Sequence, residues 1–266
     1  MQEYNNTDQH IHLLSQVIAK VNRTYVPAKE DDSHTNLYFD PIGKKVLGRW
    51  FTPVEARFIF ALNLAHFQFE LIDDKLTTVR TVSISGKNIQ ELETEIEVEF
   101  KNLGFDTSEL TKKLHYEIPA YEFAASKMKP IDSRHLTEWA SYRSLANTAC
   151  NDLLGLSQIE GEIRIWPHHF DTGIYFEPNA QVGIGFGLAM EDEMIGAPYF
   201  YFSGYPKTGE ISYKDLPASE YWEWHAGEHW KGCTLSLTTL EGCSEVERKN
   251  ILFDYLSNVY LWLVNV

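Results

Sequence analysis

Apolar and polar residues alternate in helical or strand-like patterns along most of the chain. Near the N-terminus, Leu14, Val17, Ile18 and Val21 recur at helical spacing, so residues 8–22 are predicted to form a helix. Two later helices carry capping boxes, in which a polar residue is followed three positions later by Glu. They are expected at 88–103, starting with Asn88 and Glu91, and from Ser244 and Glu247 to about residue 263. A further helix is expected at 133–154, ended by Gly155.

Between these helices, period-two alternation predicts strands. In the first half of the chain strands are expected at 36–40, 45–51, 65–71, 76–84 and 114–118. A short helix starting at Thr52-Pro53 competes with the beginning of the apolar segment 57–72, and the polar row His66, Gln68 and Glu70 is expected to face solvent. In the second half strands are expected at 162–166, 172–177, 181–189, 198–204 and 231–239.

Each half of the chain therefore has the order helix, strands, helix. This order predicts an α+β fold with mostly antiparallel sheets flanked by helices. We expect one compact domain spanning 1–266, with pseudo-repeat halves of about 1–125 and 126–266, because no segment between them resembles a flexible linker.

Composition narrows the classes of partner. Of the 266 residues, 44% are hydrophobic and 23% charged, as in ordinary globular proteins, and 14% are aromatic, which favours aromatic-rich sheets or an aromatic pocket. The formal net charge of −15 argues against nucleic acid and anionic membranes as partners, since both require a basic face.

Cysteine usage and the termini bear on location. Cys150, Cys233 and Cys243 are odd in number and irregularly spaced, which argues against a disulfide framework and favours a reducing, cytoplasmic location. Cys150 falls on the apolar stripe of its helix and is expected to be buried. The first residues lack a signal-peptide pattern, and no run of about 18 apolar residues predicts a membrane helix.

The most site-like segment is Trp166-Pro167-His168-His169-Phe170-Asp171. Pro167 ends the preceding strand, so the following residues lie at a strand end, where functional groups are often presented. In an extended chain His169 and Asp171 point to the same side and His168 to the other. A histidine beside a carboxylate suits acid–base chemistry or a divalent metal. The competing interpretation is a histidine bonded to backbone, with Asp171 capping a turn.

A second candidate is the Trp-rich segment 221–230. It holds His225, Glu228 and His229, and the four-residue spacing of its histidines places both on one face of a helix or of a strand. Together with His169 and Asp171 these residues form the predicted metal ligands. The alternative is a surface loop that packs on the sheet.

Two further features suggest the walls of a site. Gly183, Gly185 and Gly187 leave one face of a strand bare, and either a ligand or a Trp or Tyr from a neighbouring strand is expected to lie on it. Tyr199 and Tyr201 share a face of the next strand and are candidate ligand contacts. Arg143, on its helix's apolar stripe, is another ligand-binding candidate; we expect its guanidinium to reach solvent unless a carboxylate pairs with it.

The chain resembles a bacterial family of unknown function. The resemblance rests on a W-P-x-H-F-D segment (166–171), a P-Y-x-Y strand (198–201) and a Trp-rich turn (222–232), with weaker similarity at 16–21 and 36–39. It implies one shared architecture. His169 and Asp171 match fixed positions of the W-P-x-H-F-D pattern and are favoured as site residues, whereas His168 occupies its variable position. The resemblance does not extend to His225 and His229, and it implies no activity.

Three functions are consistent with these patterns. The preferred one is a binding or enzymatic pocket for a small polar molecule, with His169 and Asp171 as its catalytic chemistry and with Trp166, Tyr199 and Tyr201 as walls. The second is a metal-dependent enzyme with a divalent cation as cofactor. The third is a non-enzymatic interaction protein that buries residues 221–230 against a partner or in a homodimer.

Overall fold

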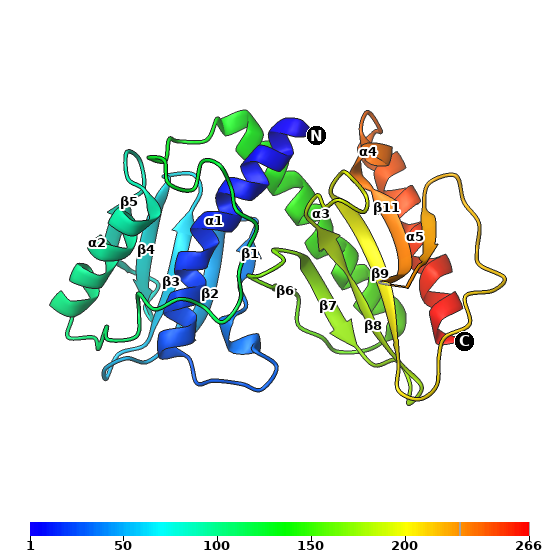
Figure 1. The fold of residues 1–266 in the computed structure, drawn as a ribbon, viewed down its shortest axis with the longest axis horizontal. Coiled ribbons are helices and arrows are strands. Elements are labelled where there is room, and N and C mark those ends of the chain that lie inside the picture. Colours follow the sequence, from blue (N-terminus) through cyan, green and yellow to red (C-terminus); the bar gives the residue numbers. More distant parts are fainter. Residues whose placement is uncertain (229, 266) are drawn as a thin grey trace. The chain divides into compact units, whose positions relative to one another are not determined.

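The computed structural model describes residues 1–228 and 230–265, and it has an α+β fold with two antiparallel sheets (Figure 1). The predicted fold class is therefore confirmed. The chain divides into two compact units. The N-terminal unit comprises Asn6–Ser141 and Ile165–Phe170, and the C-terminal unit comprises Met1–Asn5, Tyr142–Arg164 and Asp171–Val266.

The N-terminal unit contains a five-stranded sheet and two long helices. Its elements are α1 (Gln2–Tyr25, from Asn6 onward), a short 3-10 helix (Ser33–Thr35), β1 (Tyr38–Asp40), β2 (Lys45–Phe51), β3 (Phe58–Asn63), β4 (Gln68–Asp73), β5 (Thr78–Ser83) and α2 (Ile89–Asn102). Successive strands pair in chain order. The capping box predicted for α2 is present, since Asn88 and Glu91 exchange hydrogen bonds of 2.9 and 2.8 Å.

Apolar residues on one face of this sheet pack against the helices. Phe60 stacks on Phe69 and meets Phe100 of α2 edge to face, with ring centroids 5.3 and 5.4 Å apart. Gly48 lies beside a shift in the β2–β3 register, and a Cβ there would come within 2.8 Å of the Ile18 side chain. A residue without a side chain therefore allows α1 to approach the sheet closely.

Three predictions for this unit are wrong. The segment 57–72 is a hairpin of β3 and β4 rather than one late strand, and no helix forms at 52–55. Residues 114–118 have no strand structure. Glu70 is buried rather than solvated, because Asn63, Gln68 and Lys45 contact its carboxylate at 2.7–2.8 Å.

The C-terminal unit contains a six-stranded sheet. Its elements are α3 (Ser133–Ser157, from Tyr142 onward), β6 (Arg164–Ile165, of which Arg164 belongs to this unit), β7 (Thr172–Phe176), β8 (Val182–Ala189), β9 (Tyr199–Pro206), β10 (Glu223–Ala226), β11 (Lys231–Ser236), α4 (Leu237–Leu240) and α5 (Glu245–Val264). The strand order is β10-β11-β9-β8-β7-β6, so β11 lies between β9 and the edge strand β10. The predicted capping box at Ser244 and Glu247 is confirmed.

One face of this sheet packs on α5. Tyr255 of α5 meets Phe202 edge to face at 5.3 Å and donates a 2.6 Å hydrogen bond to the carbonyl of Cys233. Phe200 and Phe202 share this face of β9, and the intervening Tyr201 therefore points to the other face. Gly155 does not end α3, which continues to Ser157.

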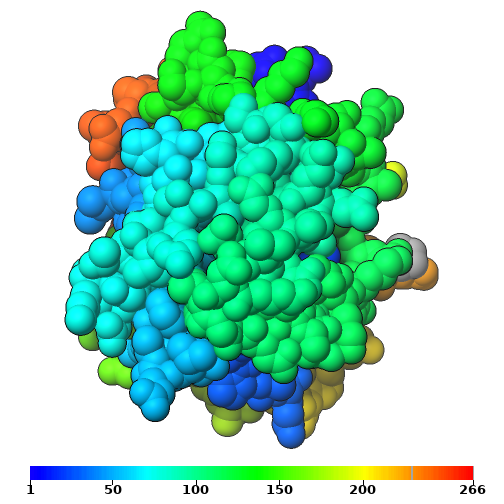
Figure 2. Space-filling model, turned by 90° about the vertical axis from the view of Figure 1, so that its left-hand side faces the viewer, coloured from blue at the N-terminus to red at the C-terminus, as the bar shows by residue number. Residues whose placement is uncertain are grey.

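Figure 2 looks onto the part of the N-terminal unit that carries α2, whose outer surface lies at the centre of the view. This surface is polar, and glutamates of α2 pair with Lys20 at 2.6 Å, Lys101 at 2.7 Å and Arg80 at 3.1 Å. None of the helices in the described part of the chain combines the length and the apolarity that crossing a bilayer requires.

Candidate functional site

The segment singled out by the sequence is a tight turn rather than an extended chain. The strand before it is Arg164–Ile165, shorter than the predicted 162–166, and residues 167–169 form a turn. The amide of Phe170 donates to the carbonyl of Trp166 at 2.6 Å, and Phe170 has a left-handed φ of 55°. The prediction that His169 and Asp171 share a side assumed an extended backbone, and the turn at residues 167–169 removes that assumption. We call Trp166–Phe170 the histidine turn.

Two side chains of α1 hold the histidine turn in place. The carbonyl oxygen of the buried Pro167 accepts hydrogen bonds from His12 Nε2 at 2.9 Å and Gln16 Nε2 at 2.7 Å. The fully buried Phe170 ring stacks on His12, with centroids 5.0 Å apart, and on Trp139 at 6.4 Å. Trp166 is half-buried, and its carbonyl closes the turn. Proline and phenylalanine therefore act as scaffold residues in this segment.

The two histidines of the turn differ in their surroundings. His168 is half-buried, and desolvation, followed by the neighbouring His169 and His115, lowers its pKa to about 4. Its ring lies 4.3 Å from that of His169 and 5.5 Å from that of Tyr116. His169 is exposed. His168 is consequently a neutral imidazole near pH 7, whereas His169 is the one presented to solvent.

Asp171 belongs to the C-terminal unit, unlike His169. It is only 8% exposed, and the hydroxyl of Tyr201 donates a 2.5 Å hydrogen bond to its Oδ2. Desolvation and the nearby Asp171 carboxylate raise the pKa of Tyr201 well above its usual value, so the phenol keeps its proton. We call Tyr201 and Asp171 the tyrosine–aspartate pair.

The pair lies on the sheet face opposite α5. Tyr201 is on β9 and Asp171 directly precedes β7, and β8 lies between these two strands. In the register, Tyr201 of β9 is opposite Gly187 of β8, which is opposite Gly173 of β7. A Cβ on Gly187 would lie 2.6 Å from the carbonyl oxygen of Thr172. Glycine therefore allows β7 and β8 to approach, and it leaves no side chain between Tyr201 and Asp171.

The other two glycines of β8 lie beneath tyrosines. A Cβ on Gly183 would collide with the ring of Tyr175, and one on Gly185 would approach the ring of Tyr205 to 3.2 Å. The expectation that an aromatic residue of a neighbouring strand covers the bare face is confirmed at these positions. Both tyrosines are about half exposed, at 47% and 50%. We call this side of the sheet, with Asp171, Tyr175, Tyr199, Tyr201 and Tyr205, the tyrosine face.

The remaining predicted ligand contacts have internal partners. Tyr199 is buried and donates to Asp192 Oδ2 at 2.6 Å. Arg143 is fully buried, so the expectation that its guanidinium reaches solvent is wrong; its Nη1 donates to Thr172 Oγ1 at 2.9 Å. Cys150 is buried as expected, and burial followed by the Asp171 charge raises its thiol pKa.

Those of the predicted metal ligands that lie in the described part of the chain are not gathered into a site. His225 lies on β10 with Nε2 2.8 Å from Thr234 Oγ1, Glu228 is exposed, and His229 lies outside the described residues. Across residues 1–228 and 230–265, no group of three or more His, Cys, Asp and Glu side chains is arranged to hold a metal ion.

The indoles of the Trp-rich segment form hydrogen bonds and packing contacts within the C-terminal unit. Trp222 and Trp224 donate indole hydrogen bonds of 3.1 and 3.0 Å to the carbonyl of Pro217, and Trp224 packs on Trp262 of α5 at 4.7 Å. Trp230 donates to Ser203 Oγ at 3.1 Å. The alternative of packing on the sheet therefore describes these three indoles.

The sequence patterns missed four residues that matter most to the histidine turn: His12, Gln16, Tyr116 and Tyr121. The signal available was the four-residue spacing of Asp8, His12 and Gln16, which places three polar side chains on one helix face. The structure buries all three. Comparison with protein-family models, with curated proteins and with solved structures gives no match to this chain.

Proposed function

We propose that the C-terminal unit binds a small polar molecule on the tyrosine face, with the tyrosine–aspartate pair as its recognition centre. The observation that carries this proposal is the 2.5 Å hydrogen bond from Tyr201 to the nearly buried Asp171, on the face opposite α5. A buried carboxylate requires strong hydrogen-bond partners, and a hydroxyl or ammonium group of a bound ligand would add to those that Asp171 already has.

The chemistry of this face indicates the class of ligand. An ionised carboxylate accepts hydrogen bonds and does not donate them, so the ligand should carry hydroxyl or ammonium donors. The half-exposed rings of Tyr175 and Tyr205 offer apolar surface beside the pair, and their centroids are 5.8 Å apart. Polyols, amino alcohols and small amines fit these features better than anions do, given the net charge of −15.

Ligand-observed NMR with a panel of polyols, amino alcohols and amines tests the proposal. We expect at least one compound to bind the wild-type protein and to bind Tyr201→Phe and Asp171→Asn at least about tenfold more weakly, as loss of a charge-assisted hydrogen bond predicts. Tyr221→Phe, which removes the hydroxyl of an exposed tyrosine that is not part of the tyrosine face, is the matched control. Unchanged affinity in both pair variants, or no binder in the panel at millimolar concentration, contradicts the proposal.

We place the protein in the cytoplasm as part of this proposal, supported by its three free cysteines. The metal-dependent and Trp-mediated alternatives stay open as hypotheses. Neither has a specific observation in its favour among the described residues, because the candidate metal ligands are dispersed and the tryptophans pack internally.

A further inference from the structure

A long segment without helix or strand, residues 104–132, joins α2 to α3 within the N-terminal unit. We call it the strap. It runs antiparallel along α1, because its contacts move toward the helix N-terminus as the strap residue number rises (Figure 1). In strap order the partners are Asp106 with Tyr25, residues 109–113 with Arg23, Tyr116 with Gln16, Tyr121 with His12, and Phe123 with His10.

The two ends of the strap are anchored by buried apolar side chains. Phe105 and Leu110 are buried at its beginning, and Met128 is buried near its end. The Met128 backbone also exchanges hydrogen bonds of 2.8 Å with Lys87 and Gly86. Residues 111–127 between these anchors are mostly exposed, with no fully buried side chain among them. Segments with few buried apolar contacts are those that open most readily.

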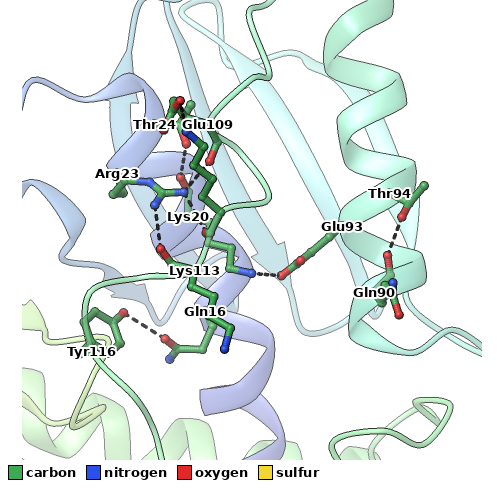
Figure 3. Close-up of polar contacts among 11 residues, drawn as sticks. Gln16, Lys20, Arg23, Thr24, Gln90, Glu93, Thr94, Glu109, Lys113 and Tyr116 are labelled. Carbon is green, nitrogen blue, oxygen red and sulfur yellow. Dashed lines mark hydrogen bonds and ion pairs between the residues drawn. The ribbon is translucent and has the colours of Figure 1, made fainter.

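Polar contacts hold this middle part against α1. Tyr116 donates to Gln16 Oε1 at 3.0 Å, as Figure 3 shows, and the Tyr121 hydroxyl lies 2.6 Å from His12 Nδ1. The same two α1 side chains donate to the carbonyl of Pro167 in the histidine turn. We call these four side chains and the Pro167 carbonyl the clasp.

The hydrogen-bonding groups of the clasp can be assigned as donors or acceptors. A carbonyl oxygen only accepts, so His12 Nε2 must carry a proton to donate to Pro167. In the neutral tautomer that carries this proton, Nδ1 accepts a hydrogen bond from the hydroxyl of Tyr121. Likewise, the amide nitrogen of Gln16 donates to Pro167, and its oxygen accepts from Tyr116. Loss of either phenol therefore removes a hydrogen bond from a buried side chain that orients the histidine turn.

We propose that residues 111–127 form a lid that opens from α1 as a unit, and that the clasp couples this opening to release of the histidine turn. The coupling follows from the shared side chains: His12 and Gln16 are held in their rotamers from the strap on one side and from Pro167 on the other. Closing the lid fixes the position of His168 and His169, and opening it loosens both histidines.

Limited trypsin digestion and hydrogen exchange test the lid and the coupling separately. Cleavage after Lys113 and Lys127 reports opening of the lid, and amide exchange in a peptide covering residues 164–171 reports the turn. In the double variant Tyr116→Phe, Tyr121→Phe we expect both rates to rise about tenfold, since two hydroxyl hydrogen bonds are lost while both rings remain.

Tyr25→Phe is the matched control, because it removes a strap hydrogen bond of 2.9 Å outside the clasp. It should change neither rate by more than about twofold. Faster cleavage without faster exchange at 164–171 overturns the coupling, and unchanged cleavage overturns the lid. Equal increases in the control overturn both, since they indicate general destabilisation. Should the double variant fail to fold, each single variant is compared with the control in the same way.

Discussion

The two units share the order helix, strands, helix, but they hold their long loops in different ways. In the N-terminal unit the strap is held by polar side chains of α1, with Arg23 donating to three carbonyls at 2.7–3.1 Å. In the C-terminal unit residues 207–222 are held by indoles: Trp222 and Trp224 bond to Pro217, and Trp262 donates to the carbonyl of Lys214 at 3.3 Å.

This difference sets how easily each loop is released. An indole contributes buried apolar area as well as a hydrogen bond, so it still stabilises the loop when one of these two contributions is lost. A hydrogen bond between polar groups contributes little net stability while it is intact, and its loss is costly when a buried partner is left unsatisfied. We therefore expect the strap to open readily and residues 207–222 to stay in place.

The largest expected effect tests the indole anchors. Trp262→Ala removes ring contacts to Trp224 at 4.7 Å and Tyr213 at 5.4 Å. We expect the free energy of unfolding to fall by about 3 kcal/mol, the lower part of the range for truncated tryptophans because the ring is only partly buried. Urea unfolding measures the loss. Leu261→Ala, at an exposed neighbouring position, is the control. If Trp262→Ala loses no more free energy of unfolding than this control, the indoles do not anchor residues 207–222 and the contrast between the two loops fails.

A smaller effect is expected at the charged anchor of the strap. Arg23→Ala breaks three hydrogen bonds from a guanidinium and should lower the free energy of unfolding by about 2 kcal/mol. Arg134→Ala removes an exposed arginine bonded to Asp132 and should cost much less, because solvent screens an exposed ion pair. Urea unfolding of the two variants compares them. If the two variants lose the same free energy of unfolding, the strap is not anchored at Arg23.

The smallest effect concerns the buried carboxylate of the N-terminal sheet. Burial raises the pKa of Glu70, but hydrogen bonds from Lys45, Gln68 and Asn63 outweigh it, and the net pKa is lowered. A carboxylate with a lowered folded-state pKa adds stability above its unfolded pKa of about 4.3, and that stability is lost as pH falls through the folded value. Glu70→Gln should therefore cost about 1 kcal/mol at pH 7 and progressively less on acidification below about pH 4.

Chemical unfolding at pH 7 and pH 3 checks this dependence. Glu95→Gln, on the more exposed surface of α2, serves as the control for a glutamate outside the sheet. A Glu70 variant whose deficit stays constant with pH would show that packing, rather than charge, is what the substitution disturbs.

Local patterns were sufficient for most of the fold. The capping boxes at Asn88 and Ser244 located two helix starts, and alternation located β2, β7, β8 and β9 within one to two residues. Alternation failed at 114–118, where Leu114 and Tyr116 alternate with polar neighbours but no partner strand is present. A strand requires a neighbour to satisfy its backbone groups, and the pattern of one segment carries no information about that neighbour.

The candidate site was less predictable. Tyr199 and Tyr201 were placed on one face by strand parity alone, and the structure agrees. The burial of Arg143 was missed because helical spacing shows which stripe a residue occupies, without showing how deeply the helix is covered. The clasp was missed because its members lie up to 155 residues apart in the chain.

The Trp166–Asp171 segment separates the two kinds of information. Its residue types, with Pro167 after a strand and Phe170 before Asp171, were enough to predict a strand end that presents polar groups. Only the tertiary structure assigned those groups: Pro167 to His12 and Gln16, His168 to a half-buried place with a lowered pKa, and Asp171 to Tyr201. Local sequence sets backbone preference, whereas burial and hydrogen-bond partners depend on distant segments that only the folded chain brings together.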